Sequence, residues 1–385
     1  MKDNKTPINS KILTIITLVV CLILFVFGYL WARPEKEEVI QADDYAEYDN
    51  GTVIQVLSDS TTVDPVAENA KRGEQLLIVE MTSGQYKGEM LQVYNYVGPI
   101  YGEPLKEGDS CTLTVSTYSD GTVTATVFEY NRQTPILIVI ALFFIATILV
   151  GGKKGLQSLI GLIITILSIF LILFPALLKG APTLPTTLGI CIYVSLVSLV
   201  ILSGVSKKTI CAFLGTTMGM VLAFIFAMIT QKLLRISGLR MADVEPLLQL
   251  RQTGTPIGLR GLLSASVIIS SLGAVMDVAM SLSSALQEVH EANNKLNTKE
   301  LFTSGMNIGR DMVGTMTNTL ILAFLGSSLV LTLYIYSIGL SLNQFLSSSY
   351  LAVEIATGIS SSIGVILSVP LTALIASIAY SKKES

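Results

Sequence analysis

Charged residues are scarce in this sequence of 385 residues. Asp, Glu, Lys and Arg occupy 14% of the positions, whereas hydrophobic residues occupy 51%. An average soluble domain carries about 25% charged residues, so the composition predicts a membrane protein. The formal net charge is -3, and the basic residues stand in small clusters beside apolar segments. This balance gives no indication of a nucleic-acid partner.

Side chains that bind metals are also few. The single histidine, His290, falls in a stretch that we expect to be a polar loop, which argues against the usual zinc and triad chemistries. Cys21, Cys191 and Cys211 lie in apolar segments, Cys111 lies in a polar stretch, and no C-x-x-C spacing occurs. The cysteines are therefore predicted to pack in the interior, and we expect no disulfide framework, metal site or other cofactor.

Long apolar runs are abundant. A bilayer core about 30 Å thick needs about 20 apolar residues per helix. Eight segments approach that length: 12–31, 135–152, 158–178, 186–204, 209–234, 261–284, 312–339 and 351–380. The predicted fold is therefore an α-helical polytopic membrane protein with about eight transmembrane helices.

Short lysine clusters orient these helices. They are Lys2, Lys5 and Lys11 before the first segment, then 153–154, 207–208 and 382–383 after the second, fourth and eighth. Because basic residues favour the cytoplasmic side, both termini are predicted to be cytoplasmic. The loop 231–260 carries five basic residues on the other side of this scheme. A re-entrant or interfacial segment at 239–250 would account for that exception.

Three parts follow along the chain. Residues 1–31 combine a basic start with an apolar run, and no small-residue cleavage pattern follows, so we interpret them as an uncleaved signal anchor. Residues 32–134 are polar enough for a water-soluble domain, which the orientation places outside the cytoplasm. Residues 135–385 are predicted to form a domain of seven transmembrane helices.

Apolar and polar residues alternate in the inserted domain, 32–134. Five runs are typical of strands: TVIQVLS, EQLLIVEMTS, YKGEMLQVYNYV, SCTLTVSTY and TVTATVFEY. Five strands that must cover one another predict a small all-β barrel of the oligonucleotide/oligosaccharide-binding kind, with a sandwich as the alternative. Tyr94, Tyr96, Tyr101 and Tyr118 either stack on a sugar or peptide or serve as cross-strand packing partners.

Polar residues recur along the sixth and seventh predicted helices, the seventh of which we extend back over MNIGRD, before residue 312. In the sixth, Ser266, Ser270, Gly273, Asp277, Ser281 and Ser284 are three or four residues apart and share one helical face. In the seventh, Asn307, Asp311, Gly314 and Asn318 repeat that spacing, with Arg310 and Thr317 at the border of the face. Such faces either pack helices closely together or line a polar path.

An antiparallel hairpin of these two segments would place the charged residues at similar depth. We therefore expect Asp277 to face Arg310, Asp311 or both. One arginine and two aspartates have a formal charge of -1, which favours a bound proton or cation. The alternative is a structural ion pair between Asp277 and Arg310, with Asp311 among the cytoplasmic headgroups.

The eighth segment continues the pattern with Glu354, Gly358 and Ser361. Glu354 lies close to the outer end of its helix. It either belongs to a polar path or complements the helix dipole from the first turn.

Two motifs together carry a family resemblance. LGAVMDVAMSLSSALQE followed by SGMNIGRDMVGTMTNTLILA, behind an anchored N-terminal domain and a run of apolar helices, is similar to the YibE/F family of bacterial multi-pass membrane proteins. The resemblance implies a bacterial plasma-membrane protein and, in some cases, a second related subunit. It supports Asp277, Gly309, Arg310 and Asp311 as site residues and names no substrate.

Three functions fit these residues. In the first, a transporter or permease moves a small solute or ion past Asp277, Arg310, Asp311, Asn307, Asn318 and Glu354, without an enzymatic step. In the second, a membrane scaffold or sensor binds a cell-envelope partner through its outer domain, and the polar helices only pack. The third is an intramembrane aspartyl protease, but neither the G-x-G-D nor the Y-D signature occurs within the apolar segments. The expected partners are the lipid bilayer and a second YibE/F-like subunit or another copy of the chain.

Overall fold

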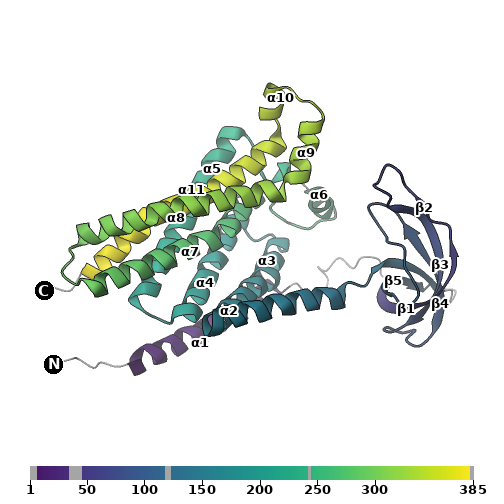
Figure 1. The fold of residues 1–385 in the computed structure, drawn as a ribbon, viewed down its shortest axis with the longest axis horizontal. Helices are drawn as coiled ribbons and strands as arrows, with labels where there is room; N and C mark the ends of the chain where they lie inside the picture. The colour runs from purple at the N-terminus through teal and green to yellow at the C-terminus, as the bar shows by residue number, and fades with distance from the viewer. Residues whose placement is uncertain (1–6, 34–45, 118–122, 242–243, 382–385) are drawn as a thin grey trace. The chain divides into compact units, whose positions relative to one another are not determined.

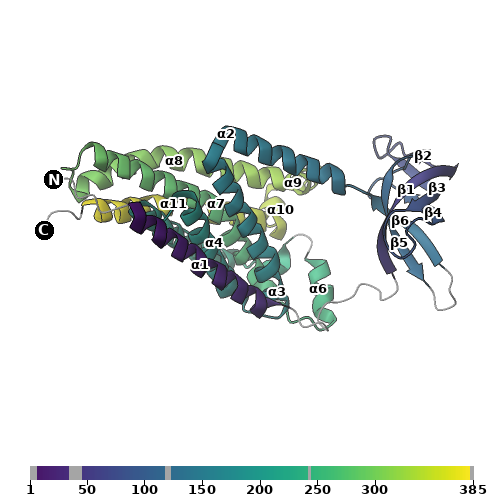
Figure 2. The same ribbon diagram turned by 90° about the horizontal axis from the view of Figure 1, so that it is seen from below.

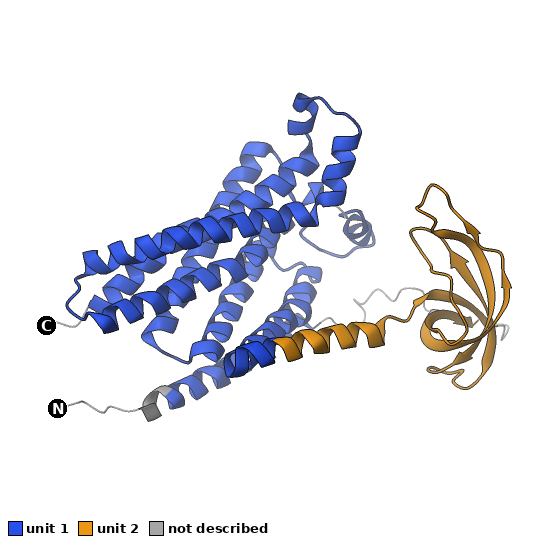
Figure 3. Cartoon of the chain, viewed as in Figure 1, with its two compact units in different colours: residues 1–34, 147–385 blue, residues 35–146 orange. Residues whose placement is uncertain are grey.

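The computed structural model describes residues 7–33, 46–117, 123–241 and 244–381. The protein is mostly helical, with several long apolar helices and one small barrel of five strands (Figure 1). Two compact units result (Figure 3). One comprises residues 1–34 and 147–385, and the other comprises residues 35–146.

The barrel confirms the strands that the alternating pattern predicted. Its strands are β1 (Ala46–Asp59), β3 (Lys71–Met81), β4 (Met90–Val97), β5 (Ser110–Thr117) and β6 (Val123–Tyr130), and a two-residue strand β2 (Thr62–Val63) pairs with β3. The sheet runs in the order β1-β5-β6-β4-β3, and β1 also pairs with β3, which closes it. Closure leaves the five strands without a free edge, so a barrel rather than a sandwich forms.

The barrel interior is apolar, with one polar network. Leu77, Val79, Val93 and Leu113 are fully buried because alternate residues of each strand point inward. Cys111 is also fully buried, and burial, with a smaller contribution from Asp109, raises the pKa of its thiol to about 12. Such a thiol stays protonated and unreactive at neutral pH.

Two buried amides tie the barrel together. Gln75 is 2% exposed and Asn95 is 1% exposed. The Asn95 Nδ2 donates to Gln75 Oε1 at 2.9 Å and to the carbonyl of Glu103 at 2.9 Å, while the backbone N–H of Leu105 donates to the same Gln75 oxygen. These bonds join the connection after β4 to the barrel. They also give the two buried amides the hydrogen-bond partners that buried polar groups normally have.

The membrane-length helices belong to the unit of residues 1–34 and 147–385, except that residues 133–146 of α2 belong to the barrel unit. They are α1 (Pro7–Ala32), α2 (Gln133–Ser168) with the π-helix η1 (Ile169–Leu173) and α3 (Phe174–Leu178), α4 (Thr183–Ser203), α5 (Lys207–Leu234), α7 (Leu262–Ala292), α8 (Thr298–Ser327), α9 (Leu329–Ser337), α10 (Leu342–Leu346) and α11 (Ser349–Ser381). The connection from α5 to α7 holds η2 (Gly238–Arg240), the short helix α6 (Glu245–Gln252) and η3 (Leu259–Gly261). Figure 2 shows α1 beside α4, where the Tyr193 hydroxyl donates to the carbonyl of Cys21.

Six helical stretches in the described part of the chain are long and apolar enough to cross a membrane, or seven if the bent pair α8 and α9 counts as one. The segments expected at 135–152 and 158–178 lie in one 46-residue stretch, Gln133–Leu178. A straight helix of that length would measure about 69 Å, more than twice a bilayer core. The backbone leaves helical geometry at Gly152, which has a positive φ of 55° that glycine adopts readily.

The helix expected at 312–339 starts earlier in the structure and is bent. α8 begins at Thr298, where Asn297 and Glu300 form a capping box, and the helix axis bends by 64° between α8 and α9. The bend follows Gly326, and the hydroxyls of Ser327 and Ser328 both donate to the carbonyl of Phe324. Hydroxyls that bond back to the helix in this way, next to a glycine, are a common cause of kinks.

The helices α5, α7, α8 and α11 pack together (Figure 1), and small residues lie at their contacts. A Cβ built on Gly219 of α5 would lie 2.7 Å from Val275 of α7 and 2.8 Å from Ser368 of α11. A Cβ built on Gly364 would lie 2.7 Å from the Ala223 side chain. We call this contact the α5–α11 seam. It follows the rule that membrane helices approach closely where glycine, alanine and serine face each other.

Candidate functional site

The polar residues of α7 divide between two environments. Ser270, partly buried, lies 2.9 Å from the hydroxyl of buried Ser361 on α11, so this pair joins the two helices. Ser266 and Ser284 turn their hydroxyls to carbonyls of their own helix. Gly273, Asp277 and Ser281 are exposed and, at four-residue spacing, form a continuous outward stripe.

The polar residues of α8 face outward as well. Asn307, Arg310, Asp311, Gly314 and Asn318 are all exposed. A Cβ added to Gly273 or to Gly314 would meet no atom within 4 Å. We call the two outward stripes, on α7 and on α8, the open polar faces.

The opposite side of α8 explains this orientation. Gly305 and Gly309 are buried, and an added Cβ would lie 3.0 Å from Ala373 at the first and would collide with Val369 at the second. α8 therefore packs on α11 through these glycines, and the exposed Asn307, Arg310 and Asp311 lie on other sides of the helix. Gly309, predicted to pack helices together or to line a path, lies at this packing contact.

The expected contact between Asp277 and Arg310 is absent. The ion pairs between described residues all lie in the barrel unit, and the Arg310 Nη1 donates to Asn307 Oδ1 at 3.3 Å on its own helix. No hydrogen bond joins Asp277 to Asp311 among the residues that the structure describes. The Arg310 side chain is exposed and α8 packs mainly along α11, so the predicted contact does not form among the described residues.

Asp277 and Asp311 lie at similar distances from the turn between α7 and α8, as predicted. Asp277 is 15 residues before the end of α7 at Ala292, and Asp311 is 13 residues after the start of α8 at Thr298. At 1.5 Å per residue, both lie about 20 Å from the turn that joins the two helices. The charged residues therefore lie well inside their helices.

The remaining predicted residues occupy other positions. Thr317 is partly buried, and its hydroxyl has no hydrogen-bond partner among the described residues. Gly358 is buried, and a Cβ there would lie 3.4 Å from Phe324. Glu354 is partly buried on α11 and lines a cavity between the ends of α8 and α11. Tyr118 and the lysines at 2, 5, 382 and 383 lie outside the described residues.

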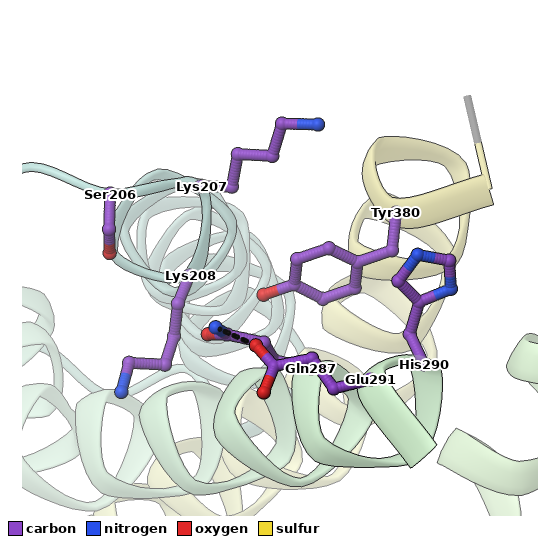
Figure 4. A pocket seen from close by; sticks show the side chains of 7 residues that line it. All are labelled: Ser206, Lys207, Lys208, Gln287, His290, Glu291 and Tyr380. Atoms are coloured by element: carbon purple, nitrogen blue, oxygen red, sulfur yellow. Dashed lines mark hydrogen bonds between the residues drawn. The ribbon is translucent and has the colours of Figure 1, made fainter. Parts of the chain in front are cut away.

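A second group of polar side chains was not expected from the sequence. His290 lies in the last turn of α7, not in a loop, and its ring stacks on Tyr380 with the centroids 6.1 Å apart. Figure 4 shows this stack beside Gln287, whose Nε2 donates to Glu291 Oε1 at 2.7 Å. These side chains line a pocket, and Ser206, Lys207 and Lys208 at the N-terminus of α5 form the rest of its lining. The sequence signal that could have indicated this pocket is the pair of lysines at the start of a helix.

The comparisons with known proteins agree with the helical unit. The family described as YibE/F-like protein matches residues 139–382, which run from α2 beyond the end of α11. The chain belongs to this family. The YibE/F-like match leaves out α1 and the strands of the barrel. No curated protein and no solved structure matches the chain.

Proposed function

We propose that this YibE/F-like chain is a non-enzymatic transport or permeation protein of the bacterial plasma membrane, moving a small solute or ion. One observation carries the proposal: charged and amide side chains lie exposed on membrane-length helices, far from the helix ends. A charged residue facing lipid at the bilayer centre costs about 2.5 to 3.5 kcal/mol on insertion scales. Such residues persist where they face water, a solute or another protein.

The open polar faces favour a path that a second subunit completes. Asp277, Arg310 and Asp311 have no ionic partner in the described part of the chain, and the exposed glycines leave room for close approach of another helix. A second copy, or a related YibE/F-like subunit, would cover these faces. Asp277 and Asp311 would then carry protons or cations, Arg310 would hold an anionic group or balance them, and Asn307 and Asn318 would supply hydrogen bonds.

The same proposal includes the topology. Eight spans, with the Gln133–Leu178 stretch crossing twice around Gly152, keep both termini cytoplasmic and put residues 32–134 outside the cytoplasm. The lysine clusters support this orientation because they then share the cytoplasmic side.

A flux assay tests the transport function. Purified wild type and Asp277→Asn are reconstituted at equal density into proteoliposomes, and proton and cation fluxes are followed with entrapped indicators. We expect the variant to lose most of the flux, because an amide neither binds a proton nor balances a cation. Glu288→Gln is the matched control, since Glu288 is an exposed carboxylate of α7 about three turns nearer the helix end. Equal flux in both variants, or none in the wild type, would contradict the proposal.

A scaffold or sensor function has separate support from the barrel. Tyr94 and Tyr96 are 46% and 53% exposed on β4, and their rings are stacked with centroids 6.4 Å apart. Exposed aromatic rings on a small barrel suit a sugar or peptide of the cell envelope. Retention of the full chain on immobilised cell-wall glycan, lost in Tyr94→Ala with Tyr96→Ala, would support this second function.

A further inference from the structure

A cavity lies where the bend after α8 separates that helix from the first turns of α11. It encloses about 370 Å³ and is walled by the last turns of α8, by α9 and α10, and by α11. Its size falls within the range of small-molecule sites, roughly 300 to 1,000 Å³. The cavity lies away from the charged residues of the open polar faces, none of which line it.

The walls of this cavity are almost entirely apolar. Leu325, Leu351 and Ile355 contribute hydrocarbon, and two phenyl rings come from Phe324 on α8 and Phe345 on α10. The hydroxyl of Ser328 donates to the carbonyl of Phe324, so its proton is already used. Such a lining favours an apolar guest because it removes the guest's surface from water.

One carboxylate interrupts the apolar wall. Glu354 is partly buried in the cavity, and no ion pair or hydrogen bond joins its carboxylate to another described residue. No second ionisable side chain lines the cavity. A metal ion would require several oxygen ligands, and the described residues contain no group of three or more His, Cys, Asp or Glu that could hold one.

We propose that this cavity binds a lipophilic organic monocation, such as a quaternary ammonium or phosphonium ion. The cation pairs with Glu354, its apolar body fills the hydrocarbon wall, and the faces of Phe324 and Phe345 attract the positive charge. A neutral lipid chain would leave the carboxylate without a counter-charge, and an anion would be repelled. The site does not depend on the transport proposed for the open polar faces.

Equilibrium binding to the full chain tests the site. Purified protein in nanodiscs is titrated with radiolabelled tetraphenylphosphonium and with the smaller benzyltriethylammonium, and empty nanodiscs correct for partition into lipid. We expect saturable binding of at least one cation at one site per chain. Glu354→Gln should weaken it by roughly tenfold or more, as expected when one member of a desolvated charge pair is removed.

Two further variants separate charge from folding. Glu354→Asp retains the carboxylate and should keep most of the affinity, whereas Phe345→Ala should weaken binding and leave the protein monodisperse. Glu288→Gln removes an exposed carboxylate of α7 outside the cavity and should bind like the wild type. The assignment would be overturned by full affinity in Glu354→Gln, by equal competition from neutral triphenylphosphine oxide, or by no binding of either cation above the lipid background.

Discussion

The barrel and the helical unit treat their polar side chains in opposite ways. The barrel buries the amides of Gln75 and Asn95 and bonds them to each other, and Arg132 on its surface pairs with Glu103 and Glu129. The helical unit buries glycines and hydroxyls in the α5–α11 seam and turns its charges outward on the open polar faces. A water-soluble barrel can leave charges exposed at little cost, whereas a membrane helix cannot.

The two units also differ in whether their charged side chains find ionic partners within the unit. The barrel pairs Arg132 with its own Glu103 and Glu129, although the buried Asn95 Oδ1 and Asp49 Oδ2 have no hydrogen-bond partner among the described residues. Asp277, Arg310 and Asp311 have no ionic partner within the described part of the chain, so we expect the membrane unit to be completed by a solute, water or a second subunit.

The largest effect is expected in the α5–α11 seam. Gly219→Leu forces a side chain against Val275 and Ser368, and overpacking of this kind costs about 3 kcal/mol. Gly273→Leu makes the same change on an open face and should leave the folded chain unharmed. Heating followed by size-exclusion chromatography compares the two variants. If the two variants were equally stable, the seam would be no more closely packed than the open face, and the prediction would be wrong.

A cross-linking experiment tests whether a second copy covers the open polar faces. Gly314→Cys places a thiol at an exposed, unobstructed position of α8, and oxidation in native membranes should convert a large share of the chain to a disulfide dimer. Ile229→Cys is the control, because Ile229 is exposed on α5 among apolar neighbours and should face lipid. Dimer yield as low as the control, at every position tried along 307–318, would argue against a second copy.

A moderate effect is expected inside the barrel. Asn95→Ala removes both donors of that amide and leaves Gln75 Oε1 and the Glu103 carbonyl with fewer partners, at a cost of about 1 to 3 kcal/mol. Cys111 reports the loss, because its buried thiol reacts with a maleimide only when the barrel opens. We expect faster labelling of Cys111, located by peptide mass spectrometry, with flux unchanged. Wild-type labelling rates would show that the network does not stabilise the barrel.

The smallest effect concerns charge on the barrel surface. The hydrogen bond from Arg132 holds the pKa of the Glu129 carboxyl below its ordinary value of about 4.3. The pair therefore contributes its full stability above that pH and loses it as the pH falls through the lowered pKa. Being largely exposed, it should contribute less than about 1 kcal/mol. Glu129→Gln should slightly increase how often the barrel opens and exposes the Cys111 thiol at neutral pH. This difference from wild type should vanish under acid.

Much of the local structure followed from the sequence. The five strands of the barrel were predicted because inward and outward residues alternate along a half-buried strand. Likewise, three- and four-residue spacing placed Gly273, Asp277 and Ser281 on one face of a helix. The break at Gly152 coincides with the predicted end of the segment 135–152. The bend before α9 was missed because an apolar run gives little sign of where its helix breaks.

The sequence by itself determined that this is a membrane protein of long apolar helices with an inserted barrel, and which polar residues share a helical face. Only the tertiary structure decided that Gly309 packs inward while Asp277, Arg310 and Asp311 face outward. Periodicity relates residues within one helix and carries no information about which neighbour that helix approaches. The choice of face depends on how closely α5, α8 and α11 can pack through their glycines, which is a property of helix pairs.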